Sequence, residues 1–345
     1  MNYKELAKHF GISPAAISLI VNNKPGVSDA TRARVLSGLS EMGYSGLVKT
    51  ESSFVPEIQN LLFVVFKRDG MILDMHPFFM LLIEHIEARA RKYNYNIMFS
   101  TIDLRNPIED QIEHLNTLNA AGAIIFATEM IDADLSYFEN YSKPYLMLDN
   151  NFMHYGVNTV TINNEMGTWQ AIEHLIKMGH KRIGYLACKS RINSFKEREA
   201  GFRNALAQYG LAFDPSDTYF LTFTEEGSYR DFASILAEHP DLPTAFVSDD
   251  DTIVMGVMRA LKEAGYSVPE DVSLIGYDDR PMCEIASTPL TTVNVSRNSF
   301  AAYAVDIIAG IIENKKTPEP AGYRSLKARV ETWLTIRDSV RDLNS

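Results

Sequence analysis

Carboxylate, guanidinium and aromatic side chains follow several short apolar runs of this chain, each placed just after its run. We expect the runs to be strands of parallel sheets, and such sheets bind ligands at the carboxyl ends of their strands. Carboxylates accept hydrogen bonds from vicinal hydroxyls, Arg donates a bidentate fork, and aromatic faces cover a sugar ring or stack on a base. The pattern therefore predicts a site for a small polyhydroxylated ligand or a purine. The candidate ligand contacts are Phe78, Phe79, Asp149, Arg198, Phe223, Asp249 and Asp278.

Some residues at these positions also have a simpler structural interpretation. Asp250 and Asp251 precede a helix predicted over 252–264, and because Asp is a common N-cap residue we expect Asp251 to cap it. Phe79 is equally consistent with a place in the core. The consecutive carboxylates Asp249 to Asp251 point in different directions and lack the ligand spacing of a calcium loop, so they predict no metal site.

No common catalytic or cofactor motif is found in the sequence. It contains no Gly-x-Ser-x-Gly elbow, no His-Glu-x-x-His pair and no Gly-x-x-x-x-Gly-Lys phosphate loop. We therefore expect no catalytic residues, no cofactor and no bound metal. An enzyme is a distant alternative.

The N-terminal 45 residues carry a second pattern that is typical of DNA recognition. One helix is predicted over 3–10, Gly11 permits a turn, and a second helix begins with Ser13 as its cap and Pro14 at its first position. Two short helices joined by a Gly-containing turn form a helix-turn-helix, whose second helix enters the major groove. A third helix over 28–42 completes a compact unit. A purely structural helix pair is the alternative interpretation.

The predicted recognition helix presents mostly small and aliphatic side chains. Such groups contact thymine methyls but cannot form the bidentate pair to guanine, so we expect an A·T-leaning half-site. The polar and basic side chains are expected to contact phosphates or base edges, with ordinary solvated charge as the alternative for the basic ones. The candidate DNA contacts are Lys4, Ser13, Pro14, Ala15, Ala16, Ser18, Leu19, Asn22, Lys24 and Arg32.

Charge is distributed unevenly along the 345 residues. The net charge is −11, yet residues 1–50 hold six Lys and Arg against three Asp and Glu, which leaves −14 on the rest. A basic head on an acidic body fits DNA contact confined to one end. The two cysteines, Cys188 and Cys283, indicate free thiols in a reducing compartment. No signal peptide or membrane-spanning stretch is found, so we expect a cytoplasmic protein without a membrane partner.

From Leu61 onward, apolar strand-like runs alternate with amphipathic helical segments in two successive series. Repeated βα units predict parallel sheets with helices on both faces. We therefore expect an all-α helix-turn-helix headpiece at 1–45, a polar linker at 46–60 and a two-lobed α/β body at 61–345 with a cleft between the lobes.

Several stretches of the chain resemble signatures of the LacI/GalR family of bacterial transcription regulators. The resemblance covers the headpiece and continues through the body. The matching stretches are 3–13, Ile17-Ser18, Val21-Asn22, Val27-Ser28, Thr31-Arg32, Gly43-Tyr44, His76-Pro77-Phe78-Phe79, 179–186, Arg198 to Gly201-Phe202, Ala205-Leu206, 268–273, 276–279 and 289–293.

The resemblance implies a body similar to type I periplasmic sugar-binding proteins, in which three crossovers join two lobes. The first lobe would comprise about 61–162 plus 294–319, and the second about 163–292 plus 322–340. The crossovers are expected near 161–165, 291–295 and 318–323. A helix over 299–313 would return to the first lobe, and a last strand at about 326–334 would return to the second.

The chain departs from the family pattern at three positions. Residues 46–60 lack the Ala-Arg-x-Leu pattern of the family's hinge helix, so Leu47 is a weak candidate for a minor-groove wedge. Asp249 stands where the family often has Asn, and His76 stands where it usually has Asn. The departure at Asp249 leaves the identity of the ligand open, and we expect no functional role for His76.

Together these features predict a homodimeric DNA-binding regulator, a repressor, that recognises a two-fold symmetric operator. A small effector, a carbohydrate or sugar derivative, would bind between the lobes, and lobe closure would change operator affinity. A purine-responsive regulator with its ligand as co-repressor is the alternative. A solute-binding protein is a more distant one, because the headpiece is intact.

Overall fold

The computed structural model describes residues 3–22, 24, 26–44, 58–75, 78–314 and 324–345. The chain divides into two compact units, Met1–Ile58 and Gln59–Ser345. Each unit has a hydrophobic core of its own. The predicted linker at 46–60, including Leu47, falls largely outside the described residues, as do His76 and the crossover expected at 318–323.

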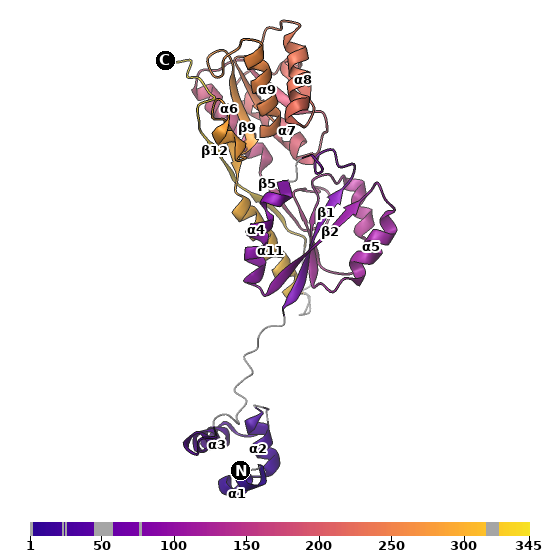
Figure 1. Ribbon diagram of the computed structural model, residues 1–345, viewed down its shortest axis with the longest axis vertical. Coiled ribbons are helices and arrows are strands. Elements are labelled where there is room, and N and C mark those ends of the chain that lie inside the picture. Colours follow the sequence, from indigo (N-terminus) through magenta and orange to yellow (C-terminus); the bar gives the residue numbers. More distant parts are fainter. Residues whose placement is uncertain (1–2, 23, 25, 45–57, 76–77, 315–323) are drawn as a thin grey trace. The chain divides into compact units, whose positions relative to one another are not determined.

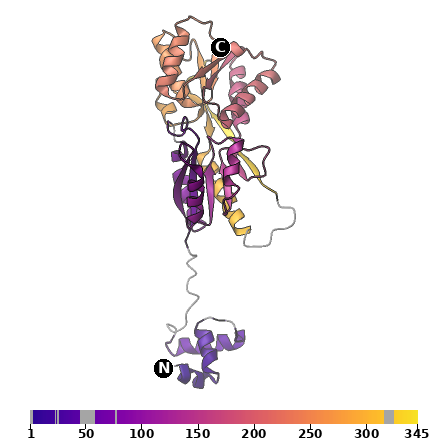
Figure 2. The ribbon, with the colours of Figure 1, turned by 90° about the vertical axis from the view of Figure 1, so that its right-hand side faces the viewer.

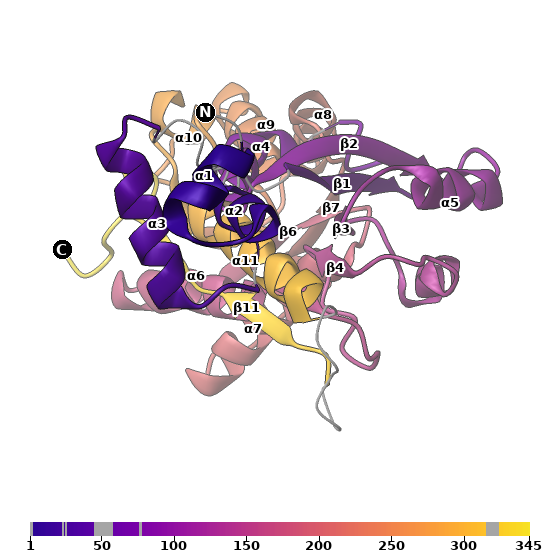
Figure 3. The ribbon, with the colours of Figure 1, turned by 90° about the horizontal axis from the view of Figure 1, so that it is seen from below.

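The N-terminal unit is a three-helix bundle, seen in Figure 3 as α1 (Tyr3–Phe10), α2 (Pro14–Val21) and α3 (Asp29–Glu41). The Ser13 hydroxyl accepts a hydrogen bond from the amide of Ala16 at 3.1 Å, as expected for the cap of α2. Gly11 has φ +65°, a left-handed conformation that turns the chain sharply between α1 and α2. The core of the unit is formed by Leu6, Ala7, Ile17, Ile20, Val21, Val35 and Leu39.

The first lobe of the body is built on a six-stranded parallel sheet. Its strands, in spatial order, are β11 (Lys327–Val330), β5 (Thr159–Ile162), β4 (Tyr145–Leu148), β3 (Gly122–Phe126), β1 (Gln59–Lys67) and β2 (Tyr95–Asp103). Helices α4 (Ile83–Arg91) and α11 (Arg297–Asn314) pack together beside it (Figure 1). The α5 helix (Ile108–Thr117) and η3 (Asp132–Phe138) contact each other and contribute to a second hydrophobic cluster of this lobe. The short helix η2 (Phe78–Leu81) leads into α4.

The second lobe has a sheet of the same size in which one edge strand is antiparallel. Its strands, in spatial order, are β12 (Thr332–Thr335), β10 (Thr291–Val295), β9 (Ser273–Asp278), β8 (Ala245–Ser248), β6 (Ile183–Cys188) and β7 (Thr218–Leu221). Helices α6 (Asn164–Lys177) and α7 (Asn193–Gln208) form one pair, and α8 (Glu225–Leu236) and α9 (Asp251–Glu263) form the other. The short helices η4 (Pro215–Asp217) and α10 (Met282–Ile285) lie in the connections.

The C-terminal strand predicted at 326–334 is in fact two strands in different sheets, and this prediction was wrong. β11 pairs with β5 in the first sheet, whereas β12 pairs with β10 in the second. Only Glu331 separates them, so the chain crosses between the lobes there (Figure 2). The stretch 327–335 contains no Gly, Pro, Asn or Asp, so the sequence has no turn signal at the change of sheet.

The cysteine side chains and the lengths of the helices bear on the expected free thiols and on the expected lack of a membrane span. Cys188 and Cys283 are buried free thiols, and burial raises the pKa of Cys188 to about 12. Within the described ranges, every helix is too short or too polar to cross a bilayer.

Candidate functional site

One cavity in the body brings together five of the seven predicted ligand contacts. Phe78, Asp149, Arg198, Phe223 and Asp278 all line it. The carboxylates follow β4 and end β9, as the expectation for parallel strands requires. Because both lobes contribute walls, the cavity is the cleft between them. Ligand contact itself stays a prediction.

Arg198 on α7 occupies the centre of the polar wall and is almost completely buried. Its Nε donates to the Asn164 Oδ1 at 3.0 Å, and its Nη2 donates to the Asp278 Oδ1 at 3.1 Å. The guanidinium carbon lies 3.7 Å from the ring centroid of Tyr277, a cation–π contact. Burial alone would lower the pKa of Arg198, but the Asp278 charge raises it, so this side chain stays a cation. Its position is therefore fixed before any ligand arrives.

Asp149 and Asp278 face the cavity from opposite lobes, both with positive φ. The Thr128 hydroxyl donates to the Asp149 Oδ2 at 2.6 Å. Burial raises the pKa of Asp149 to about 7, partly offset by that hydrogen bond and by Arg198. Burial also raises the pKa of Asp278, against the lowering effect of Arg198. The Asp149 carboxyl can therefore accept or donate hydrogen bonds near neutral pH, which suits a hydroxyl-rich ligand.

Asp250 and Arg280 also line the cavity, and the sequence analysis did not select them. The Arg280 Nη2 lies 3.2 Å from the Asp250 Oδ2 and 3.7 Å from the Asp278 Oδ2. Asp250 is at the same time the N-cap of α9, because its Oδ1 accepts from the Thr252 amide at 2.7 Å. The cap was expected at Asp251, one residue too late. Asp250 lies two residues after β8 and Arg280 two residues after β9, and this position in the sequence could have identified both.

The structure places the other two predicted contacts, Asp249 and Phe79, away from the cavity. Asp249 is fully buried and accepts from the Tyr185 hydroxyl at 2.6 Å and from the Cys188 amide at 2.7 Å. It also forms an ion pair with Arg191. These three donors turn its carboxylate into the second lobe, so its expected place in the cavity was wrong. Phe79 packs in the first lobe, with its ring centroid 6.0 Å from that of Phe126.

Apart from Thr128 and Ser194, the remaining lining of the cavity is apolar. Ile72 and Leu73 come from the first lobe, and Phe195 and Phe223, whose ring centroids are 5.7 Å apart, come from the second. The cavity volume is about 30 Å³. Pockets for small molecules usually measure about 300–1,000 Å³. The cleft in this structure is therefore nearly filled by its own side chains.

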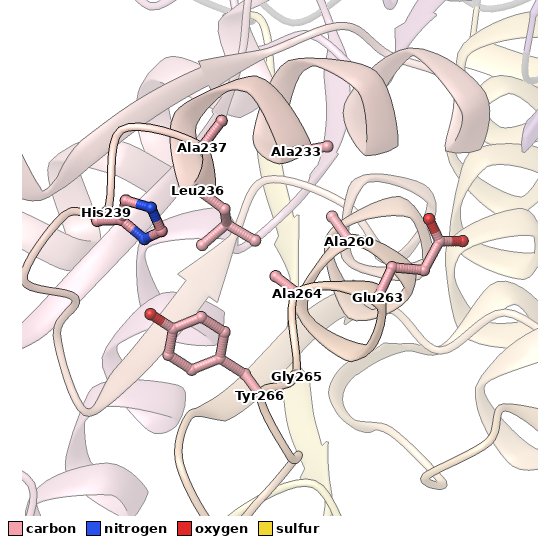
Figure 4. Close-up of a pocket in the computed structure, with 9 residues that line it drawn as sticks. All are labelled: Ala233, Leu236, Ala237, His239, Ala260, Glu263, Ala264, Gly265 and Tyr266. Carbon is pink, nitrogen blue, oxygen red and sulfur yellow. The ribbon is translucent and has the colours of Figure 1, made fainter.

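A larger hollow lies between α8 and α9, and its lining residues differ in chemistry from those of the cleft. Figure 4 shows alanine side chains and Leu236 along its floor, with His239, Glu263 and Tyr266 around it. Its volume is about 420 Å³. Glu263 is engaged by the Tyr229 hydroxyl at 2.5 Å and by Arg259 at 3.1 Å. The hollow thus offers little convergent polar chemistry. Among the described residues, no group of His, Cys, Asp and Glu is arranged to hold a metal ion.

In the N-terminal unit, the predicted DNA contacts lie on and beside α2. Pro14 and Ala15 are exposed at its start, and Lys4 and Lys24 are exposed nearby. The Asn22 amide donates to the Ser18 carbonyl at 2.9 Å. The remaining predicted contacts are the cap Ser13, the half-buried Ala16, Ser18 and Leu19, and Arg32, which donates to the Lys24 carbonyl. The unit therefore presents a helix start of small side chains flanked by cations.

Two family models match the two parts of the chain. The first, described as bacterial regulatory proteins of the lacI family, matches residues 2–46. The second, described as a periplasmic binding protein-like domain, matches residues 172–340. The chain belongs to the LacI/GalR family of bacterial transcription regulators. A LacI/GalR member of this architecture is a DNA-binding transcription regulator, and the two sheets are the lobes of its periplasmic-binding-protein-like body.

Similar proteins span nearly the whole LacI/GalR architecture. The HTH-type transcriptional repressor PurR of Actinobacillus pleuropneumoniae serotype 3 is 27% identical over 344 residues, covering 99% of this chain and 98% of the relative. The HTH-type transcriptional regulator GalR of Escherichia coli K12 is 26% identical and covers 92% of this chain and 90% of the relative.

Solved structures share the fold at lower identity. A transcriptional regulator CelR–cellobiose complex has a TM-score of 0.71 at 23% identity, covering 98% of this chain and 99% of that one. The lac repressor dimer bound to operator and the anti-inducer ONPF has a TM-score of 0.68 at 22% identity, covering 99% of both chains. These likenesses support the fold of the LacI/GalR body.

Proposed function

We propose that this regulator is a repressor that binds a two-fold symmetric operator as a homodimer and responds to a small effector bound between its lobes. The observation that carries the proposal is that Asp149 of one lobe and Arg198 and Asp278 of the other line a single cavity, in a chain that also contains a helix-turn-helix unit. The relevant segments are the headpiece at 1–45, the linker at 46–60 and the effector-binding and dimerisation body at 61–345. Different effector affinities of the open and closed lobes would couple the cavity to DNA binding.

A sugar or sugar derivative is the effector class that the polar wall favours. Asp149, Asp250 and Asp278 offer carboxyl oxygens at one cavity, beside the guanidinium groups of Arg198 and Arg280. Vicinal hydroxyls donate to such carboxylates and accept from Arg, while Phe78 and Phe223 would cover the C–H face of a ring. The cellobiose complex of the similar CelR regulator agrees with this choice.

A purine effector acting as co-repressor is the second candidate. Relatives that are named PurR match 99% of this chain, and Phe78 and Phe223 would stack on a base as readily as they cover a sugar. The two candidates are separated by thermal unfolding of the full chain with sugars and with purines. A ligand at 100 times its dissociation constant stabilises the protein by about 2.7 kcal/mol.

On the DNA side, we infer that Pro14, Ala15, Ala16 and Leu19 face base edges and that Lys4, Lys24 and Arg32 contact phosphates. Ser13, Ser18 and Asn22 add contacts to phosphates or bases, although Ser13 also caps α2 and Asn22 is bonded to Ser18. The small side chains favour A·T-rich half-sites.

Dimerisation would cover exposed apolar side chains of the body. Phe99 lies on the edge strand β2 with 52% of its surface exposed, and Ile285 on α10 is 85% exposed. The similar lac repressor structure is a dimer on its operator. A dimer would also bring two modestly charged headpieces to one DNA site, as binding to a two-fold symmetric operator requires.

Selection of sites from a randomised duplex pool at two salt concentrations tests the proposal. We expect a two-fold symmetric, A·T-leaning consensus that persists at the higher salt concentration. Binding without a consensus that disappears with salt would contradict it, because phosphate contacts alone carry no sequence information.

A further inference from the structure

A short segment of the first lobe, residues 68–74, is held against the cleft by a single carboxylate. We name this segment the strap. Glu129, which follows β3, accepts hydrogen bonds from four strap amides: Arg68 at 2.9 Å, Gly70 at 3.0 Å, Ile72 at 2.9 Å and Leu73 at 2.8 Å. The Glu129 side chain is almost completely buried. Four donors to one buried carboxylate fix the backbone of the strap far more tightly than an ordinary loop contact does.

The strap is also a tight turn that is tied down on its outer side. The Asp74 amide donates to the Gly70 carbonyl at 3.0 Å. Gly70 has φ +75°, and a Cβ there would lie 2.3 Å from the Asp74 Oδ2, so only glycine fits. Lys67 and Arg105 pair with Asp74 at 2.6 Å and 2.9 Å. These ties hold the strap on the side away from Glu129.

The conformation of the strap sends Ile72 into the other lobe. Ile72 is 5% exposed and belongs to the apolar cluster that includes Phe195, Phe223 and Leu186 of the second lobe. In the part of the chain that the structure describes, Ile72 is the one first-lobe member of that cluster. The neighbouring Leu73 belongs to a different hydrophobic cluster, which includes Phe78. Met71, which precedes Ile72 in the strap, is 51% exposed.

Ile72 also lines the cavity, whose volume is about 30 Å³. That is roughly a tenth of the volume of a small ligand pocket, which measures at least about 300 Å³. A sugar or a purine therefore requires one wall of the cavity to move. The ion pairs of Arg198 and Arg280 hold the polar wall in place. The Ile72 side chain, by contrast, meets the second lobe through apolar contacts.

We propose that the strap is a built-in plug of the effector cleft: Glu129 positions Ile72 across the lobes, and effector binding displaces it. Glu129 is thus a positioning residue, and Ile72 sets the size of the ligand that the cleft accepts. The plug also holds the lobes together without effector, because it supplies the apolar contact beside Phe195 and Phe223. The role of the plug in effector binding rests on the proposed function of the cleft, whereas its docking across the lobes does not.

Hydrogen exchange of the full chain without ligand tests the docking. Glu129→Gln replaces one acceptor oxygen by a donor that faces the strap amides, so exchange at residues 70, 72 and 73 is expected to rise at least roughly tenfold. Ile72→Ala keeps the Glu129 bonds but removes the contact across the lobes, so exchange should rise in residues 186–195 and 221–223 instead. Met71→Ala, with its exposed side chain on the same strap, is the matched control and should change neither region.

Unchanged exchange at residues 70–73 in Glu129→Gln, with β3 still protected as evidence of folding, would overturn the positioning role. Unchanged exchange of the second lobe in Ile72→Ala would overturn the plug.

Calorimetric titration with D-galactose, cellobiose and hypoxanthine tests whether the plug affects effector binding. A probe that binds the native protein should bind Ile72→Ala roughly tenfold more tightly, and weaker binding would mean that Ile72 is a wall of the site and not a plug. If no probe binds either protein while the exchange results hold, the effector assignment fails and the docking of the strap stands.

Discussion

At the scale of single residues, the central feature of the cleft is the Arg198 guanidinium, whose hydrogen-bond partners come from the protein itself. Arg198 is buried with Asn164 and Asp278 as partners. Removing one member of a buried ion pair leaves an uncompensated charge and usually costs about 3–5 kcal/mol. We expect Arg198→Met to lower the free energy of unfolding of the body by about that amount, measured by urea denaturation. Arg230→Met, which removes an exposed pair with Glu226, should change it by less than about 1 kcal/mol. Equal effects of the two substitutions would contradict the assigned role.

The raised pKa of Asp149 predicts a pH dependence of stability. Burial raises that pKa from 3.8 in the unfolded chain to about 7. Folding therefore takes up a proton between these values, so the stability due to protonated Asp149 is full at low pH and is lost as the pH rises towards 7. Asp149→Asn cannot titrate, and its free energy of unfolding relative to the native protein should rise by about 2 kcal/mol between pH 5 and pH 8.

Thermal or urea unfolding at both pH values provides the measurement. Asp251, whose pKa burial also raises to about 7, is present in both proteins, so its contribution cancels in the comparison. Parallel pH profiles of the two proteins would show that Asp149 is ionised throughout this range.

The sequence predicted the cavity better than it predicted individual contacts within it. Asp149 and Asp278 could be placed because the carboxyl ends of parallel strands share one edge of a sheet. Asp249 could not, because it has three donors from parts of the second lobe that lie far away in sequence, Tyr185, Cys188 and Arg191. Its direction is set by those tertiary partners, and neighbouring residues in the sequence carry no sign of them.

At the scale of elements, the alternation of runs located the central strands of both lobes, and the connections were harder to predict. β4 and β8 occur at the predicted residues, Tyr145–Leu148 and Ala245–Ser248. The crossover expected near 291–295 occurs just after β10, because the next element, α11, packs against the first lobe. The strand predicted at 326–334 is divided into β11 and β12, which join different sheets. Periodicity reports which faces are buried, and it does not report which sheet a strand joins.

The start of α2 provides the prediction at this scale. The Ser13 hydroxyl satisfies the Ala16 amide, and loss of an N-cap typically costs about 1 kcal/mol. Ser13→Ala should therefore speed amide exchange at Ile17 and Ile20 roughly fivefold, as measured by hydrogen exchange of the full chain. Ser37→Ala, which removes an exposed bond to Glu41, is the control and should leave exchange in α2 unchanged. An equal response to both changes would show that the cap contributes nothing specific to this helix.

At the scale of the whole molecule, assembly is the property on which operator binding depends most. Ile285 is 85% exposed in the single chain, and an apolar side chain of this kind is a natural contact between subunits. We expect Ile285→Glu to convert the proposed homodimer to monomers, measured by analytical ultracentrifugation. Ile336→Glu, at another exposed isoleucine, is the matched control and should remain dimeric. A dimeric Ile285→Glu protein would move the interface elsewhere.

The charge distribution links this assembly to the salt dependence of DNA binding. Residues 1–50 carry a net +3 and the remaining residues −14, so we expect the phosphate contacts to come from the N-terminal unit. Each neutralised phosphate contributes about −0.9 to the slope of log K against log salt concentration on duplex DNA. Two headpieces on one operator double the number of contacts, so the slope should fall to about half in Ile285→Glu and stay unchanged in Ile336→Glu. Fluorescence anisotropy of a selected duplex over a series of salt concentrations measures both slopes. A monomeric Ile285→Glu protein that kept the full slope would show that one headpiece makes all the phosphate contacts, and the two-fold symmetric operator would then have to be abandoned.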